Sequence, residues 1–439
     1  MSLTLPPHSI EAEQAVLGCC LLAPDDCIAD IIEASGGDMT LFYDIRHQTF
    51  WNALSDMSEK GIAVDTITVV GHLKTSGKLD DAGGRAYIAS LPDYAASAAM
   101  IRTYLGPVVD AWQRRRMISA CSKSIAECYD STSADPISGA ETAVLAAAEE
   151  RGGAMEAVSA KEGVKAAIDV FQRLYAANGK PIGIPTGFLD IDRMTLGICE
   201  TDFWVLAARP GCGKTTLAMN IAEHVAVDLG IPVAVLSLEM PASQLMARMM
   251  SARARINQRK PMNQGSFSAL AAVSSKIAGA PLWIQDRSMH IGQIKAWCRR
   301  MKQRHGVKLF IVDYLQLIPD NGRNKDRQSA VSAISNGLKQ IALNLKTPVI
   351  ALAQLNRDIE KEKARQPRLS DLRESGSIEQ DADLVGMLWN KQKVAEDDDG
   401  SQPRTVCFSI AKQRSGPVGF IDLTMFPDIT RFENHVGSP

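Results

Sequence analysis

The sequence carries almost no excess of charge. Its 48 Lys and Arg residues nearly balance its 50 Asp and Glu residues, so the formal net charge is −2 at pH 7. A chain this close to neutrality has no overall attraction to nucleic acid, and any such binding must come from local groups of cations. The composition therefore excludes a uniformly basic nucleic-acid-binding protein.

Signals for metal binding by cysteine, for disulfide scaffolds and for membrane insertion are also missing. No apolar run approaches the roughly 20 residues that a membrane helix needs, and Met1–Pro7 lacks the basic and apolar segments of a signal peptide. The cysteines show neither paired metal spacing nor disulfide density. We therefore expect reduced thiols, a cytoplasmic protein and no membrane partner. The nine cysteines are at positions 19, 20, 27, 121, 128, 199, 212, 298 and 407.

At 439 residues, the chain is long enough for two or three domains. Residues 1–148 carry apolar positions at three- and four-residue spacing, which predicts a helical domain for assembly or partner binding. His47 and Trp51 lie in such a pattern and are expected to pack rather than bind a ligand. Residues 149–182 form a linker with one short amphipathic helix, whose apolar stripe needs cover from its own domain or from a neighbouring subunit.

Residues 183–439 alternate near-continuous apolar runs with helical patterns. This alternation predicts an α/β domain with a mostly parallel sheet. Ligands of such sheets lie at the carboxyl ends of the strands. The expected strands are Phe203–Ala207, Val233–Leu238, Leu282–Ile284, Leu309–Val312, Val349–Ala353, Leu384–Leu388 and Val406–Ile410.

The first of these strands runs into a glycine-containing turn that opens a helix, which is the setting of a phosphate-binding loop. Backbone N–H groups of such a loop cradle phosphate oxygens, Lys214 adds a charge to the β- and γ-phosphates, and Thr215 offers a hydroxyl to Mg²⁺. A chance glycine-rich turn is the alternative. The pattern predicts a nucleoside triphosphate site formed by Ala208, Arg209, Pro210, Gly211, Cys212, Gly213, Lys214, Thr215 and Thr216.

Polar residues end several of the other expected strands. Asp313 follows Leu309–Val312 and is expected near Mg²⁺. Glu239 follows a second strand and can orient a water for attack on the γ-phosphate, although an acidic helix cap is the alternative. Gln354 ends a third strand and could sense the γ-phosphate. Lys412 and Arg414 follow the expected strand Val406–Ile410. They could neutralise phosphate charge, or they could simply be solvated.

Several longer motifs make the chain resemble the DnaB-type replicative DNA helicases, a family of RecA-like hexameric helicases, almost from end to end. The resemblance is specific because it combines many segments rather than one phosphate loop. The segments are Pro7–Gln14, Ile184–Asp192, Asp313–Ile318, Gln354–Arg357, Asp371–Asp383 and Lys412–Pro417.

The resemblance implies a helical N-terminal domain, a linker helix and a RecA-like motor, assembled as a homo-hexameric ring. It implies ATP-driven 5′→3′ movement on single-stranded DNA within a primosome, with primase and a loader as partners, in a bacterial cell or phage-infected host. It also casts Glu239 as the catalytic base and places Lys412 and Arg414 in the neighbouring subunit's ATP site.

Two positions depart from the family pattern. Thr201 stands where relatives usually have a glycine before the first motor strand, and Cys212 stands where they often have another small or apolar residue. Because Cys212 precedes a helix N-terminus and lies near Lys214, we expect a reactive thiolate that bound ATP protects.

DNA contact requires local cations in a chain of this charge. One candidate stretch supplies Arg323, Lys325 and Arg327, for which a solvated surface turn is the alternative. A second stretch resembles the family's DNA-contacting loop, and its expected contact residues are Arg373, Glu374 and Gly376. Neither stretch has interleaved aromatic residues, so contact with the DNA backbone is expected rather than stacking on bases.

Two other functions share parts of this pattern. A RecA-like recombinase or repair ATPase would have the phosphate loop but would lack the N-terminal helical domain. An ATP-gated platform would recruit primase or a loader without separating strands. Unwinding of a forked duplex with a 5′ tail distinguishes a helicase from both.

Overall fold

The computed structural model describes residues 5–130, 139–140, 143–144, 147, 159–257, 260–319, 327–355, 366–372, 376–391, 402–435 and 437. The chain divides into two compact units, Met1–Ala160 and Lys161–Pro439. Within the ranges given above, every helix is too short or too polar to span a bilayer.

The N-terminal unit is helical, as its sequence pattern predicts. Its core surrounds the fully buried Phe42, Phe50 and Trp51. His47 is also buried, and its ring nitrogens lie 2.7 Å from Glu13 Oε2 and 2.6 Å from the Tyr87 hydroxyl, so it is a packing residue. The main helices are α1 (Ile10–Leu22), α2 (Pro24–Ser35), α3 (Ile45–Glu59), α4 (Thr66–Thr75), α5 (Gly84–Ser90) and α6 (Ile101–Tyr129).

The second unit begins with α8 (Ala160–Ala177), the short helix expected in the linker. Its apolar stripe is exposed, with Val164 at 59%, Phe171 at 68% and Tyr175 at 90%. An exposed stripe of this size on a helix indicates a surface that another element covers.

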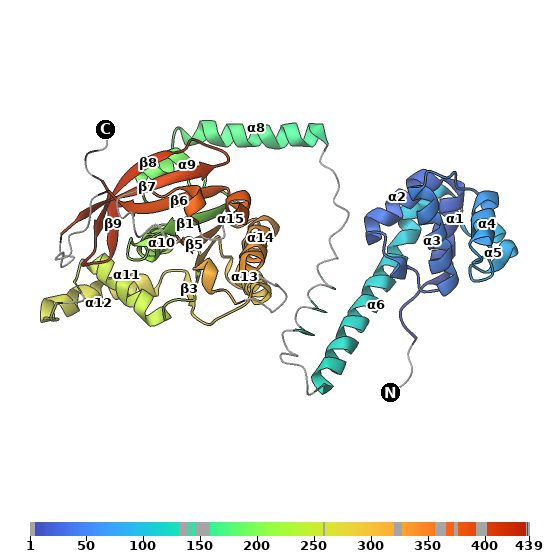
Figure 1. The fold of residues 1–439 in the computed structure, drawn as a ribbon, viewed down its shortest axis with the longest axis horizontal. Helices are drawn as coiled ribbons and strands as arrows, with labels where there is room; N and C mark the ends of the chain where they lie inside the picture. Colours follow the sequence, from blue (N-terminus) through green and yellow to red (C-terminus); the bar gives the residue numbers. More distant parts are fainter. Residues whose placement is uncertain are drawn as a thin grey trace. The chain divides into compact units, whose positions relative to one another are not determined.

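The motor is built on one sheet, which has nine strands among the described residues, in the order β3-β2-β4-β5-β1-β6-β7-β8-β9 (Figure 1). Neighbours from β3 to β6 pair in parallel, and β6 to β9 pair antiparallel. The strands are β1 (Phe203–Ala208), β2 (Val233–Ser237), β3 (Leu282–Gln285), β4 (Leu309–Asp313), β5 (Val349–Gln354), β6 (Leu384–Asn390), β7 (Arg404–Gln413), β8 (Gly419–Phe426) and β9 (Arg431–Asn434).

Helices cover both faces of this sheet, because alternate residues of each buried strand point to opposite sides. Trp204 and Leu206 of β1 lie in the cluster with α9 (Leu189–Thr195), α10 (Lys214–Glu223), α11 (Ala242–Ala254) and α12 (Gln264–Ala278). Phe203 and Val205 lie in the cluster with α13 (Ile291–His305), α14 (Arg327–Leu345) and α15 (Gly376–Asp381). The predicted fold class, a mostly parallel α/β motor with a helical N-terminal domain and a linker helix, is confirmed.

The seven predicted strands are present, but β8 and β9 were not predicted. In β8 the buried residues alternate with more exposed ones, as Ile421, Leu423 and Met425 show. This period of two is a strand signal that the sequence carries, although the polar residues between make it weaker than the continuous apolar runs.

Candidate active site

The phosphate loop joins the buried strand β1 to the N-terminus of α10. Gly211 and Gly213 have φ angles of +78° and +88°, in the left-handed region that favours glycine. A Cβ at Gly213 would also lie 2.9 Å from the Phe432 ring, closer than side chains normally approach. The loop conformation therefore requires glycine at position 213. In this conformation, the first N–H groups of α10 point toward the carboxyl edge of the sheet.

Lys214, Thr215, Asp313 and Glu239 come together at this edge, as predicted. Lys214 Nζ lies 3.2 Å from Asp313 Oδ1 and 3.3 Å from Glu239 Oε2. The Thr215 hydroxyl donates to Asp313 Oδ2 over 2.8 Å. These four side chains come from α10 and from the ends of β2 and β4, which are adjacent in the sheet. Sequence reasoning missed Tyr314, whose ring centroid lies 4.1 Å from Lys214 Nζ.

Asp313 is the most buried member of this group, with 3% of its surface exposed. Burial raises the pKa of its carboxyl group, while the charge of Lys214 and the hydrogen bonds from Thr215 and Lys214 oppose that rise. Glu239 differs, because 48% of its side chain is exposed. One carboxylate is thus fixed behind the loop, and the other faces the space where a water can enter.

The adjacent hydroxyl of Thr215 and carboxylate of Asp313 fit Mg²⁺, which binds through few protein oxygens together with phosphate oxygens and water. No group of three or more His, Cys, Asp or Glu residues suited to a metal ion occurs in the part of the chain that the structure describes.

Gln354 ends β5 directly beside the phosphate loop, since its register partner is Ala208 of β1. The side chain of a second glutamine, Gln316, forms two hydrogen bonds with the backbone of Gln354. Gln316 Nε2 donates to the Gln354 carbonyl, and the Gln354 N–H donates to Gln316 Oε1, each over 3.3 Å. Sequence reasoning assigned no role to Gln316, although its place just after Asp313 marks it as near the site.

Lys412 and Arg414 lie at the end of β7, and the partners that the structure shows for them are within the same subunit. Lys412 Nζ donates to the carbonyls of Glu379, Gln380 (3.3 Å) and Ala382 (2.8 Å), at the carboxyl end of α15. Arg414 donates to the Gln380 carbonyl over 2.6 Å and to Asp383 over 3.2 Å. The structure of one subunit therefore holds these cations at α15 and Asp383, not at its own Lys214.

The expectation of a reactive thiolate at Cys212 is wrong. The side chain belongs to the apolar cluster beneath the loop and is only 7% exposed. Burial raises the pKa of its thiol, and this effect outweighs the opposing charge of Arg209. The helix N-terminus stabilises a thiolate only when the sulfur faces it in a polar setting.

Thr201, where the family resemblance leads us to expect a glycine, adopts a φ of +70°, in the left-handed region that favours glycine. A β-branched residue is strained in this left-handed conformation.

Of the predicted DNA-contacting residues, Arg323, Lys325, Arg373 and Glu374 lie outside the described residues. Arg327 and Gly376 are described as the first residues of α14 and α15. These two helices pack together, and the Ser332 hydroxyl donates to the Ser377 hydroxyl over 2.9 Å. Both candidate stretches thus lead into one helix pair, on the sheet face that α13 also covers.

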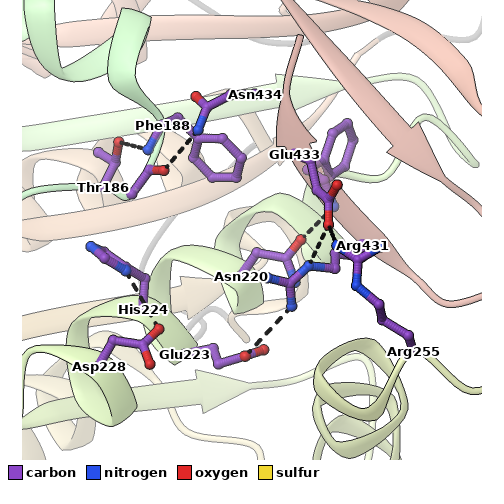
Figure 2. Close-up of a pocket in the computed structure, with 12 residues that line it drawn as sticks. Thr186, Phe188, Asn220, Glu223, His224, Asp228, Arg255, Arg431, Glu433 and Asn434 are labelled. Carbon is purple, nitrogen blue, oxygen red and sulfur yellow. Dashed lines mark hydrogen bonds and ion pairs between the residues drawn. The ribbon is translucent and has the colours of Figure 1, made fainter. Parts of the chain in front are cut away.

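A polar pocket of about 380 Å³ lies at the other end of α10 (Figure 2). Here the Phe432 N–H donates to Asn220 Oδ1 over 2.8 Å, and Arg431 lies 3.7 Å from the buried Glu223. Burial raises the pKa of Glu223, although a hydrogen bond from Arg253 opposes that rise. These contacts fasten β9 to α10 and so keep Phe432 against the glycine of the loop.

Two protein-family models match this chain. The model of the DnaB-like helicase C terminal domain matches residues 183–434, and that of the N terminal domain matches residues 5–110. The chain is 36% identical over 444 residues to the replicative DNA helicase DnaB of Geobacillus stearothermophilus, covering 98% of this chain and 95% of that protein. It is also 36% identical to the replicative DNA helicase DnaC of Bacillus subtilis, with the same coverage.

Two solved structures are similar as well. The structure of a DnaB-like replicative helicase and its interactions with primase matches with a TM-score of 0.74 and 29% identity, over 98% of this chain and all of that one. A solved ATPase domain matches with a TM-score of 0.57 and 32% identity, over 62% of this chain and 98% of that domain.

Proposed function

This chain belongs to the DnaB-like family of replicative DNA helicases, and we propose that it works as a hexameric ring that moves 5′→3′ along single-stranded DNA. It is an ATP-hydrolysing replicative helicase, in keeping with its 36% identity to such enzymes over nearly its full length. The observation that carries the catalytic part of the proposal is the grouping of Lys214, Thr215, Asp313 and Glu239 at one sheet edge.

Each of these residues has a distinct task in ATP hydrolysis. The loop from Ala208 to Thr216 binds the phosphates through its N–H groups, and Lys214 balances their charge. Mg²⁺, held by Thr215 and Asp313, would neutralise charge on the transferred phosphoryl group. Glu239 is the base that orients the attacking water, which its half-exposed carboxylate can reach. Gln354, beside Ala208, senses the γ-phosphate.

Lys412 and Arg414 serve the ATP site of the neighbouring subunit. Within one subunit, Lys214 is the cation that lies beside Asp313 and Glu239, and the developing phosphoryl charge needs a further cation. An arginine supplied from outside contributes about 10³–10⁵ to the rate of such enzymes. Arg414 lies at the motor surface with 49% of its side chain exposed, where it is accessible to another subunit.

DNA and protein partners complete the proposal. Arg323, Lys325 and Arg327 form one contact to the DNA backbone, and Arg373, Glu374 and Gly376 form the other. Residues 1–148 serve assembly and primase binding, 149–182 link the parts, and 183–439 form the motor. The similar structure that includes interactions with primase supports this partner, and a loader is proposed with it. The protein would act in the cytoplasm of a bacterial cell or phage-infected host.

A strand-separation assay tests the proposal. The protein, ATP and Mg²⁺ are mixed with a forked duplex that carries a 5′ single-stranded tail, and with a matched fork that carries only a 3′ tail. Unwinding of the first fork alone is expected, and Glu239→Gln should abolish it. ATP hydrolysis without unwinding of either fork would instead favour the assembly platform, and unwinding from the 3′ tail would contradict the proposed direction.

A further inference from the structure

Asp383, between α15 and β6, joins three parts of the motor. Its Oδ2 accepts the Phe203 N–H over 2.8 Å and Lys339 Nζ over 2.6 Å, while its Oδ1 accepts Arg414 over 3.2 Å. Its backbone also takes part, because the Arg414 N–H donates to the Asp383 carbonyl over 2.9 Å. Only 17% of the Asp383 side chain is exposed. Both the backbone and the side chain of Arg414 are therefore fixed by one residue.

The carboxyl end of α15 supplies the remaining contacts. Helix C-termini leave carbonyl groups without intrahelical partners and carry partial negative charge, so they attract cations. Here the Gln380 carbonyl accepts hydrogen bonds from both Arg414 and Lys412. Burial and the nearby charge of Arg414 lower the pKa of Lys412. An incoming anion would relieve this repulsion.

The two cations differ in what they can still donate. A lysine ammonium has three N–H groups, and Lys412 makes three hydrogen bonds to carbonyl groups. An arginine has five N–H groups in a rigid plane, and the side-chain bonds of Arg414 to Asp383 and Gln380 use two of them. Arg414 can therefore donate hydrogen bonds to an external phosphate while it stays bound to Asp383 and Gln380. These two contacts also set the orientation of the guanidinium plane.

We propose that Asp383 is a positioning residue that orients Arg414 toward the ATP site of the neighbouring subunit. This inference rests on the proposed function of Arg414 and adds the residue that fixes its direction. Asp383 never touches nucleotide in this scheme. It acts through Arg414, so its effect falls on the subunit next to its own.

A purely structural role for Asp383 predicts a different pattern. Asp383 also binds the first residue of β1, the strand that leads into the phosphate loop of its own subunit. Damage transmitted along β1 would impair the site of the same subunit. The two roles are therefore distinguished by which subunit loses activity.

The test begins with Asp383→Asn in the full chain. Asparagine keeps a carbonyl oxygen for the Phe203 N–H but removes the charge that holds Arg414. We expect kcat for ATP hydrolysis to fall about 10–100-fold, the cost of misplacing a catalytic group by about 1 Å. KM for ATP should change less than about twofold, because Lys214 and Thr215 are intact. Lys339→Met is the matched control, since it removes another partner of Asp383 and leaves Arg414 held.

Mixed rings then locate the effect. Asp383→Asn subunits are combined with Glu239→Gln subunits, and Arg414→Ala subunits are combined with Glu239→Gln subunits as a reference. With random mixing, roughly a quarter of the interfaces place an intact Glu239 against an intact Asp383–Arg414 pair. Both mixtures should regain ATP hydrolysis well above either parent alone.

Each outcome has one meaning. Recovery in the Arg414→Ala mixture but not in the Asp383→Asn mixture would overturn the positioning role and place the effect of Asp383 within its own subunit. No recovery in either mixture would overturn the proposed action of Arg414 on its neighbour, and with it this inference. If Asp383→Asn does not assemble, Asp383→Glu, which displaces the carboxylate by one methylene, is measured in the same mixtures with the same expectations.

Discussion

Replacement of Lys214 by alanine should separate catalysis from assembly. The Lys214 ammonium is the cation that the phosphate loop places beside both Asp313 and Glu239, at 3.2 and 3.3 Å. Loss of one pre-organised group that stabilises transition-state charge costs about 10²–10³ in kcat. Since Lys214 also contacts the bound phosphates in our proposal, ATP hydrolysis should fall at least that far. The helical N-terminal unit and α8 are untouched, so the ring should persist.

The same substitution should destabilise the motor. The Lys214 and Asp313 side chains are 11% and 4% exposed, and breaking a buried ion pair costs about 3–5 kcal/mol. We expect about 3 kcal/mol, because Thr215 continues to donate to Asp313. For a domain of this size, that loss lowers Tm by roughly 6–12 °C.

The destabilisation should depend on pH in a defined direction. Burial raises the folded-state pKa of Asp313 above its ordinary value, and Lys214 opposes that rise. A carboxyl group with a raised folded pKa favours the folded state when protonated, and this contribution is lost as pH rises through the folded pKa. Without Lys214 the pKa rises further. The difference in unfolding free energy from the wild type should therefore be largest near neutral pH and shrink as pH falls.

Three measurements check these expectations: ATP hydrolysis, light scattering in the presence of nucleotide, and thermal unfolding between acid and neutral pH. Lys302→Ala is the control, since Lys302 lies on α13 and its Nζ donates to the Thr347 hydroxyl, away from the loop. Dissociation of Lys214→Ala to monomers would refute the separation of roles. A pH-independent loss of stability would refute the account of Asp313.

Other parts of the chain give three further predictions. Replacing Arg323 and Lys325 with alanine should weaken single-stranded DNA binding and reduce its salt slope by about one unit per lost phosphate contact; an unchanged slope would return this stretch to a solvated turn. Thr201→Gly should raise the unfolding free energy by about 1 kcal/mol in denaturant titrations, because it relieves a φ of +70°; a loss of stability would show that the threonine side chain contributes more than its strain costs. Burial raises the pKa of Cys199 to about 11, so at pH 8 only roughly 10⁻³ of it is thiolate. Mass spectrometry should find it alkylated far more slowly than the exposed Cys121, and equal rates would contradict this burial.

The sequence by itself determined the motor fold and which residues gather at the centre of the candidate active site. Lys214 and Thr215 follow one buried apolar strand, and Asp313 and Glu239 end two others. Because the strands of this part of the sheet are parallel, their carboxyl ends lie at one edge. Each strand and the polar residue that follows it can be recognised from the local sequence. Parallel pairing of these strands then brings residues that are distant along the chain to the same edge of the sheet. The contacts between Lys214, Asp313 and Glu239 agree with it.

Only the tertiary structure decided what surrounds that centre. Cys212 follows a pattern typical of a reactive thiol, yet packing beneath the loop buries it and raises the pKa of its thiol. The residue pattern left open whether Lys412 and Arg414 meet phosphate charge or are solvated. In the structure, α15 and Asp383 hold them across some thirty residues of chain. Burial and hydrogen-bond partners depend on which distant segments pack together. Local periodicity predicts an element and its buried face, but it does not specify which side chains that face will meet.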